Sequence, residues 1–381
     1  MAVSLVVVLL GVALVFDHLW LSGARVELQT AAESAALHGV KCLVNDETLR
    51  HPVVKESRLE KIRAAAADLA SQNLVAGNRV TLDESPEGDV RGGVLVHDEA
   101  SGNDRFLETN RRPTTVVVRP QLSRSRGNPL ALFLCGITGQ PFGDVTVVAE
   151  ATADNRVCGL RPLEGTTVPA LPLAIQAADP KGKRKDTWHE QIVKGCGADR
   201  FGWDADRGRV TESGDGIPEI VLRGADDEKD VAGTNVRWLD IGSECDTDKL
   251  IRQVRHGWSA GDLHAHGDEL VIGSRSLDVP ARACQHHDAW RSLDHVIGEC
   301  RVCLLYVDLE QPRRGKPHRV RCLVPIAGRV LHVDRDGKNR PLIVFQPGVL
   351  ATRTAVLASE YGLAEKDVVR NAYLYKLSLT Q

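Results

Sequence analysis

The first forty residues constrain this chain most, because they join a long uncharged segment to an uninterrupted helical pattern. Residues 2–16 carry no charge, Asp17 and His18 interrupt the apolar run, and residues 19–21 resume it. About twenty residues of this kind, at a rise of about 1.5 Å each, are long enough to cross a hydrocarbon core of roughly 30 Å. The stretch therefore predicts a transmembrane helix.

From residue 21 the pattern changes without any helix breaker. Apolar and small residues recur at steps of three and four, which places them on one face of a helix, while charged and amide side chains take the other positions. The face consists of Leu21, Ala24, Leu28, Ala31, Ala35 and Gly39. We therefore expect one continuous helix whose outer half is amphipathic and carries a stripe of alanines.

The motif RVELQTAAESAALHG at residues 25–39, with an acidic residue late in the apolar segment, resembles the amino-terminal signature of the TadE/TadG-like proteins. These are membrane-anchored, pilin-like components associated with the Flp (tight-adherence) pilus. His38 stands where the family usually has a small residue, and the basic residues usual ahead of the span are missing. The residues that we assign to a membrane and assembly helix are Asp17, Trp20, Arg25, Glu27, Leu28, Gln29, Ala31, Ala32, Glu33, Ala35, Ala36 and Leu37.

The resemblance implies a non-catalytic, pseudopilin-like component of a Flp/Tad pilus or of an adhesion or secretion assembly. It implies a single pass through the bacterial inner membrane, with the carboxy-terminal portion in the periplasm. The implied partners are the lipid bilayer and other Tad/Flp pilus-assembly proteins or like subunits, without any cofactor. The net charge of −3, with 26% charged residues, offers no basic field for nucleic acid.

An alternative is an exported or membrane-tethered binding protein in which the helix is only a tether or a cleaved signal. Ser22 and Ala24 supply small residues ahead of a cut before Arg25, as signal peptides require. Against this, the apolar run is longer than a usual signal core, and the helical pattern continues past the cut.

Two features of the helix each have two interpretations. Asp17 would cost about 2.5–3.5 kcal/mol at the centre of a bilayer. It either pairs with a positive group of a neighbouring subunit or lies hydrated at the headgroup level, with Trp20 as the interfacial aromatic residue. The alanine stripe allows close approach of another element. It packs either into an assembly of like helices or against the protein's own sheet.

Behind the helix the hydrophobic period becomes strand-like, which predicts an α+β fold. We expect a transmembrane anchor and TadG-like helix at 1–40, and a pilin-like ectodomain at 41–176 in which the long helix packs on an antiparallel sheet. A loop-rich linker at 177–233 and a carboxy-terminal α+β domain rich in antiparallel strands at 234–381 follow. Helices are predicted at 55–76, 249–257 and 281–298, and a short apolar helix or turn at 129–137. The predicted strands are 79–82, 93–96, 114–119, 143–152, 218–223, 303–309, 320–333 and 342–346.

One motif raises the further alternative of a metal-dependent hydrolase. His264, His266 and Asp268 have the H-x-H-x-D spacing in which two imidazoles and a carboxylate hold a zinc ion. Glu269 stands where a metallo-β-lactamase site has another histidine, and a helical turn precedes the motif instead of a strand. The pattern favours a solvated loop, and the chain is predicted not to be an enzyme.

The nine cysteines are an odd number, so they do not form a complete disulfide framework. Cys303 and Cys322 lie symmetrically about a predicted turn near residue 315, which suggests a cross-strand disulfide, although buried free thiols are favoured. A structural zinc site usually has two tight ligand pairs, and only Cys300 and Cys303 form one. The other candidate ligands for such a site are Cys284, His286, His287 and His295.

Overall fold

The computed structural model describes residues 2–51, 53–98, 103–135, 139–225, 233–242, 246–272, 277–282, 287–310, 318–337, 340–363 and 369–380. The chain divides into two compact units. The first contains Met1–Val44, His51–Ala153 and Leu377–Gln381, and the second contains Asn45–Arg50 and Asp154–Lys376. The fold is α+β, with one long amino-terminal helix and several antiparallel sheets.

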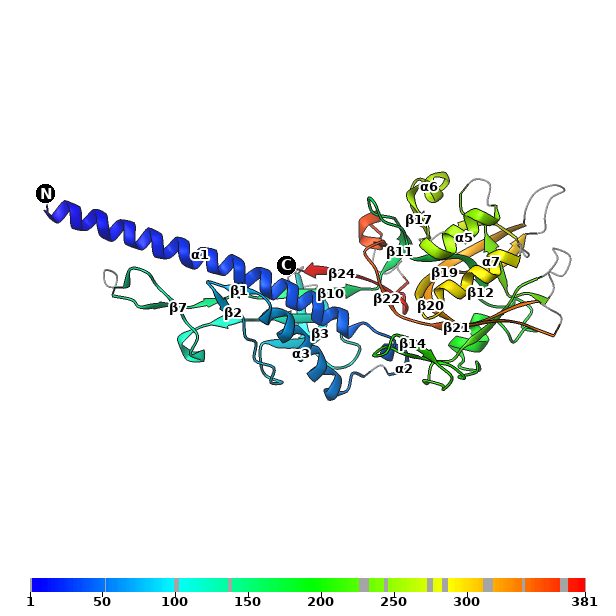
Figure 1. Cartoon of the computed structure of the whole chain (residues 1–381), viewed down its shortest axis with the longest axis horizontal. Helices are drawn as coiled ribbons and strands as arrows, with labels where there is room; N and C mark the ends of the chain where they lie inside the picture. Colours follow the sequence, from blue (N-terminus) through cyan, green and yellow to red (C-terminus); the bar gives the residue numbers. More distant parts are fainter. Residues whose placement is uncertain are drawn as a thin grey trace. The chain divides into compact units, whose positions relative to one another are not determined.

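The long helix of the first unit is α1 (Ala2–Leu43), which is 42 residues without a break. At about 1.5 Å per residue it is about 60 Å long, and Figure 1 shows it as a single rod with β7 beside it. The predicted continuous helix is therefore confirmed. Its second half packs against α3 (Glu56–Ser71) and against the sheet strand β5 (Thr115–Val118).

The sheet of the first unit is antiparallel, in the order β10–β5–β3–β4. Its strands are β3 (Val90–Asp98), β4 (Asn103–Glu108), β5 and β10 (Ala149–Asp154). Along β10, Ala149, Ala151 and Ala153 are buried and alternate with half-buried side chains, as a strand with one covered face requires. Strand β24 (Leu374–Thr380) ends in this unit, where the Thr380 hydroxyl donates to Glu150 at 2.7 Å.

Three short hairpins complete the first unit, each made of two-residue strands. They are β1 (Leu74–Val75) with β2 (Asn78–Arg79), β6 (Gln121–Leu122) with β9 (Val145–Thr146), and β7 (Leu130–Ala131) with β8 (Phe142–Gly143). The 3-10 turn η1 (Arg124–Arg126) lies between β6 and β7. The segment predicted as a short apolar helix or turn at 129–137 thus begins as a strand of a hairpin.

The second unit is built on a ladder of five strands that closes on itself, because the long strand β20 pairs with both β18 and β19. The ring contains β12 (Ala170–Gln176), β16 (Val236–Leu239), β18 (Leu277–Arg282), β20 (His318–Arg335) and β19 (Cys300–Glu310). Strands β21 (Pro341–Pro347) and β15 (Ile220–Arg223) extend the sheet from the far half of β20.

Alternate side chains of these strands enter two core clusters. The cluster around Trp238 and Trp290 also contains residues of α5 (Thr247–His256), α7 (His287–Arg291) and η5 (Ser292–Val296). The Asp246 carboxylate caps α5 by accepting the Lys249 N–H, at the start of the helix predicted at 249–257. The predicted helix at 281–298 is shorter, because residues up to 282 belong to β18.

The smaller elements of the second unit surround this ladder. They are α2 (Glu47–Arg50), β11 (Val157–Leu160), η2 (His189–Val193), β13 (Gly202–Asp204), β14 (Arg209–Thr211), α6 (Ala260–Leu263), η4 (His264–His266), β17 (Leu270–Val271), β22 (Leu350–Ala351), β23 (Ala355–Leu357) and η6 (Ala358–Tyr361). The segment 177–233, expected to be a linker, contributes β13 to β15 and the buried side chains of Trp188 and Ile217 to this unit.

Candidate functional site

Helix α1 has one narrow line of buried side chains in its first half. The number of buried positions per turn and the polarity of the exposed side chains both change along the helix. In the part that the structure describes before residue 20, only Ala13 and Asp17 are buried. The exposed large apolar side chains there are Val8, Leu10, Val12, Leu14, Val15, Phe16 and Leu19. After residue 24 the buried line widens, and the apolar positions predicted from the three- and four-residue steps lie on it.

Asp17 is held by the β7–β8 hairpin of its own chain. Its Oδ1 accepts the backbone N–H of Phe133 at 3.1 Å and that of Leu134 at 3.4 Å, and the residue is only 5% exposed. A carboxylate that accepts backbone donors makes charge-assisted hydrogen bonds, which are stronger than neutral ones. The partner of Asp17 is thus supplied within the first unit, which neither sequence interpretation included.

Aromatic side chains surround this contact. The Trp20 Nε1–H donates to the Ala131 carbonyl at 3.2 Å, and the Trp20 ring lies 4.7 Å from the Phe133 ring in a T-shaped arrangement. Phe16 contacts the other side of Phe133, with ring centroids 6.0 Å apart at 81°. Edge-to-face pairs of this kind contribute about 0.5–1.5 kcal/mol beyond burial. The hairpin is therefore fastened to one short stretch of α1, residues 16–20.

The polar residues of the RVELQ motif bind the helix to neighbouring turns. Glu27 Oε2 accepts the backbone N–H of Ala76 at 2.8 Å, in the turn between β1 and β2. The Gln29 side chain donates to Glu33 at 2.9 Å and to the Val148 carbonyl at 3.3 Å. Arg25 is exposed and Leu37 is half-buried. Glu27 and Gln29 thus attach α1 to its own unit.

The alanine stripe is covered within the first unit. Ala31, Ala32, Ala35 and Ala36 are all buried, together with Leu28. A Cβ added at Gly39 would lie 3.1 Å from Val116 Cγ1 of β5, which shows how closely helix and sheet approach. The stripe is thus covered within its own chain, where α1 packs against α3 as well as against the sheet strand β5.

Sequence reasoning missed the β7–β8 hairpin as a partner of α1. A signal was present, because residues 129–141 contain no charged residue and stand between Arg126 and Asp144. That run is consistent with a core strand, a helix or a membrane-facing loop, so the residues of α1 that contact it could not be chosen from the pattern alone.

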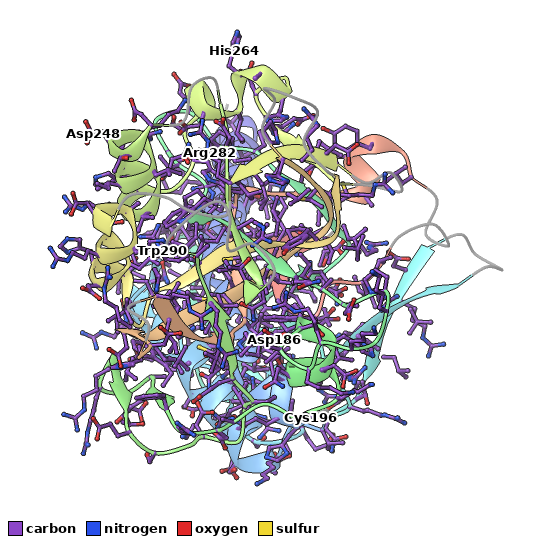
Figure 2. All side chains as sticks on the ribbon, turned by 90° about the vertical axis from the view of Figure 1, so that its right-hand side faces the viewer. Asp186, Cys196, Asp248, His264, Arg282 and Trp290 are labelled. Atoms are coloured by element: carbon purple, nitrogen blue, oxygen red, sulfur yellow. The ribbon has the colours of Figure 1, made fainter. Side chains whose placement is uncertain are left out.

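The H-x-H-x-D motif lies on η4 and in the turn after it, directly behind α6. His264 Nδ1 lies 3.0 Å from Asp268 Oδ1, and the His264 side chain is 84% exposed. Figure 2 shows His264 pointing away from the ribbon. Burial lowers the pKa of His266, so that imidazole is more readily neutral. In the described part of the chain, no group of three or more His, Cys, Asp or Glu side chains is placed to hold a metal ion.

The cysteines that the structure describes are free thiols. In the β19–β20 ladder Cys303 lies opposite Ile326 and Cys322 lies opposite Tyr306, so the two cysteines do not face each other. The suggested cross-strand disulfide between them is therefore wrong, and both are buried thiols. Cys284 and His286, and the turn near 315, lie outside the described residues.

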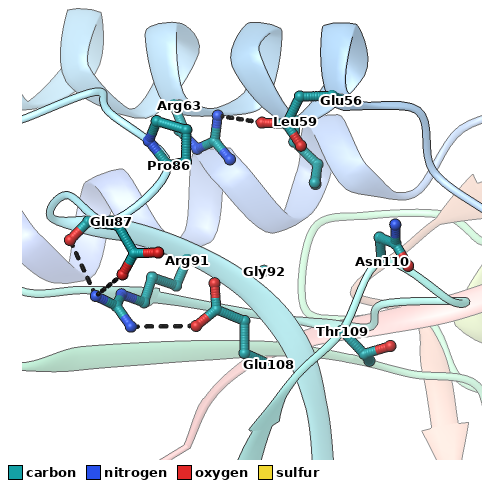
Figure 3. Close-up of a pocket in the computed structure, with 10 residues that line it drawn as sticks. All are labelled: Glu56, Leu59, Arg63, Pro86, Glu87, Arg91, Gly92, Glu108, Thr109 and Asn110. Atoms are coloured by element: carbon teal, nitrogen blue, oxygen red, sulfur yellow. Dashed lines mark hydrogen bonds and ion pairs between the residues drawn. The ribbon is translucent and has the colours of Figure 1, made fainter.

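A cavity of about 200 Å³ lies between α3 and the β3–β4 edge of the first unit. Figure 3 shows that its arginines are paired with carboxylates on their own side of the cavity, Arg63 with Glu56 on α3, and Arg91 with Glu87 and Glu108 on the sheet side. The nitrogen–oxygen distances are 2.8, 3.6 and 3.1 Å, respectively. Because both guanidinium groups have carboxylate partners, the cavity has no feature that selects a charged ligand.

In the first unit, the second half of the long helix α1 packs on the antiparallel sheet. The first half of α1, before residue 20, exposes apolar side chains. In a comparison with family models, the Tad model, described as "Putative Flp pilus-assembly TadE/G-like", matches residues 1–41, which correspond to α1. Residues 1–41 are therefore similar to the TadE/G-like Flp pilus-assembly family that the resemblance named. No curated protein and no solved structure matches the chain.

The family match indicates a role in pilus assembly and an association with the cell envelope. Within the residues that the structure describes, no helix has both the length and the apolar character that crossing a membrane requires.

Proposed function

We propose that this chain is a non-catalytic, membrane-anchored, pseudopilin-like component of a Flp/Tad pilus or of a related adhesion or secretion assembly. In this proposal the first half of α1 is a single pass through the bacterial inner membrane, and the remainder of the chain lies in the periplasm. The observation that carries the proposal is the change in α1 from an outer half packed on its own sheet to an inner half with exposed apolar side chains.

The exposed apolar surface of α1 is too large to be left in water. Seven large apolar side chains between residues 8 and 19 are exposed. Covering a side chain of this size is worth about 1.5–3 kcal/mol, so the group represents on the order of 10 kcal/mol. Monomeric soluble proteins rarely expose contiguous apolar patches of this kind. A lipid bilayer covers such a surface on every side of the helix except the line occupied by Ala13 and Asp17.

The polar face of the outer half limits how like subunits pack together. Because the alanine stripe is already covered, contacts with a neighbouring helix would use the opposite face. Val26 is 67% exposed and lies on that face between Arg25 and Glu27, which are also exposed. We place the lateral contact with other pilus-assembly subunits there.

Membrane fractionation with amino-terminal sequencing tests the anchor. The full chain is expected to stay in the membrane pellet after alkaline carbonate extraction, with its apolar segment retained. A variant that begins at residue 25 is expected to appear in the soluble fraction. A native protein that is freely soluble and begins at Arg25 would overturn the proposal, because the helix would then be a cleaved signal.

Cross-linking in native membranes tests the lateral contact. Val26→Asp places a charge on the exposed face of α1 and is expected to reduce cross-linking to pilus-assembly partners. Val193→Asp is the matched control, since Val193 is similarly exposed but lies in the second unit. Equal cross-linking of both variants and of the unchanged chain would contradict the assembly role and leave a simple tether.

A further inference from the structure

The β7–β8 hairpin has an apolar surface of its own. No charged residue occurs from 129 to 141 in the sequence. Along the described first arm, Ala131, Phe133 and Cys135 are exposed and alternate with the half-buried Leu132 and Leu134. Phe133 is 58% exposed, and Phe142 on the returning strand is also exposed.

The hairpin lies at a defined level along α1. Phe133 contacts Phe16 and Trp20, and its backbone N–H donates to Asp17. Phe16, which is 55% exposed, belongs to the apolar surface of the inner half of the helix. The exposed surface of Phe133 is thus continuous with the part of α1 for which the proposed function requires a lipid cover.

Four backbone groups in the described first arm of the hairpin have partners within the protein, as backbone at membrane depth requires. The Ala131 carbonyl accepts from Trp20, and the Leu132 N–H donates to the Pro141 carbonyl at 3.0 Å. The N–H groups of Phe133 and Leu134 donate to Asp17. Asp17 Oδ1 thus gains two donors and the two N–H groups gain an acceptor, while Asp17 Oδ2 is buried without a hydrogen-bond partner in the described part of the chain.

The base of the hairpin carries both a cation and an anion, because the Arg124 N–H donates to the exposed Asp144 carboxylate at 3.1 Å. Arg124 is exposed, and its Nη2 donates to the Phe142 carbonyl at 2.8 Å. A guanidinium group at this level is suited to the anionic headgroups of a bilayer, while the residues beyond it are uncharged. Along the sequence, the charged residues of the base are followed by the uncharged residues 129–141, which is the order from headgroup to acyl chain.

We propose that the β7–β8 hairpin is a second lipid-contacting element, which enters the headgroup region of the bilayer beside α1 with Phe133 as its apolar anchor. Asp17 is the residue that positions it. This inference rests on the proposed membrane anchor and adds a second contact with the same bilayer. The ligand is the phospholipid interface, and a second copy of the chain is the competing occupant.

The experiment uses the full chain reconstituted into vesicles of phosphatidylcholine and phosphatidylglycerol. The exposed Cys135 is a natural reporter on the hairpin, and the exposed Cys196 of the second unit is its control. Thiols are labelled with an environment-sensitive fluorophore, and the signal of each site is the difference from the Cys135→Ser or Cys196→Ser variant. Quenching is measured with lipids that carry a doxyl group high on the acyl chain.

The label at Cys135 is expected to be blue-shifted and quenched by the doxyl lipid, while the label at Cys196 shows neither effect. Phe133→Gln is expected to abolish that quenching while the protein stays in the vesicles after carbonate extraction. Val193→Asp, which alters an exposed apolar residue of the second unit, is expected to leave it unchanged.

Three results would overturn the inference, and only the third would also overturn the proposed membrane anchor. In the first, the fluorophore at Cys135 emits as it does in water while carbonate does not extract the protein. The hairpin then does not contact lipid, and the proposed anchor stands. A blue-shifted label that doxyl lipid does not quench assigns the hairpin to a second copy of the chain. Protein that carbonate extracts from the vesicles removes the proposed anchor together with this inference.

Discussion

Glu27 on α1 and Ala76 in the turn after α3 are joined by a hydrogen bond, in which the Ala76 N–H donates to Glu27 Oε2 at 2.8 Å. Ala76 has a φ of 49°, in the left-handed region that non-glycine residues rarely adopt. The acidic residue of the RVELQ motif therefore holds a backbone conformation that is itself unfavourable. This bond lies nearly three helical turns from the contact of Asp17 with the hairpin.

We expect Glu27→Ala to loosen the β1–β2 turn without unfolding the unit. The loss is about 1 kcal/mol of local stability, because one hydrogen bond to a charged, solvent-accessible acceptor is removed. Amide hydrogen exchange at Ala76 is expected to accelerate, whereas exchange in β5 stays unchanged. Glu60→Ala, at an exposed position of α3, is the control and should leave the Ala76 amide protected. Unchanged exchange at Ala76 in Glu27→Ala would show that the turn does not depend on the helix.

Asp17→Ala is expected to release the β7–β8 hairpin from α1. Two charge-assisted hydrogen bonds disappear, each worth about 1.5–3 kcal/mol when its donor is shielded from water. Exchange of the Phe133 and Leu134 amides should accelerate strongly in detergent micelles. Asp17→Asn retains a carbonyl oxygen that can still accept, so its effect should be smaller. Exchange in Asp17→Asn equal to that in the unchanged chain would mean that the charge of Asp17 does not strengthen the contact, and unchanged exchange in Asp17→Ala would mean that the hairpin does not depend on Asp17.

Ala35→Leu tests the packing of the alanine stripe. Ala35 is fully buried between α1 and the rest of the first unit, so three added carbons have no space. Overpacking of a tight core costs about 1–3 kcal/mol, which the urea midpoint of the first unit should show. Thr30→Leu makes a similar change at an exposed position of the same helix and is expected to be nearly neutral. If both variants unfold at the same midpoint, the stripe does not pack as described.

The sequence predicted α1 well and its surroundings poorly, for physical reasons that individual residues show. Helical steps of three and four residues are local, so Leu28 and Ala35 could be placed on one face before any partner was known. The partners of Asp17 and Glu27 are backbone amides more than a hundred and about fifty residues away, respectively. Any residue except proline supplies such a donor, so no side-chain pattern marks these contacts. Similarly, the register of the β19–β20 ladder places Glu310 opposite Arg319 and Cys303 opposite Ile326, so Cys322 lies four residues from the position opposite Cys303, and the approximate place of a turn could not fix this register.

Asp46→Asn is expected to destabilise the second unit. Asp46 Oδ2 lies 3.0 Å from Arg329 Nη2, and the two side chains are only 16% and 12% exposed. Asp46 Oδ1 also accepts the Val349 N–H at 2.6 Å, and the Arg329 guanidinium stacks 5.0 Å from the Trp203 ring. Removing one partner of a largely buried ion pair costs about 3–5 kcal/mol, because the other charge stays buried.

Thermal or urea unfolding of the second unit measures this loss. Asp206→Asn, in the exposed turn between β13 and β14, is the matched control and should stay within about 0.5 kcal/mol of the unchanged chain. A double variant, Asp46→Asn with Arg329→Met, should recover part of the stability, since no unpaired charge remains. An equal loss in the single and double variants would point to the Val349 hydrogen bond as the main contribution.

The two buried thiols of β19 and β20 predict that the second unit loses stability at alkaline pH. Burial raises the pKa of Cys322 from 9.0 to about 12, and burial also raises the pKa of Cys303. A raised pKa in the folded state means that the unfolded chain releases these protons first. Their contribution is therefore complete below pH 9 and is lost as the pH rises toward 12, by up to about 1.4 kcal/mol per pH unit for each thiol.

Urea midpoints measured across this range should fall, and a Cys303→Ala, Cys322→Ala variant should show a shallower fall. Replacing the exposed Cys135 and Cys196 instead should leave the dependence of the urea midpoint on pH unchanged. If the unchanged chain and both variants have the same pH dependence, groups other than the buried thiols cause the alkaline loss of stability.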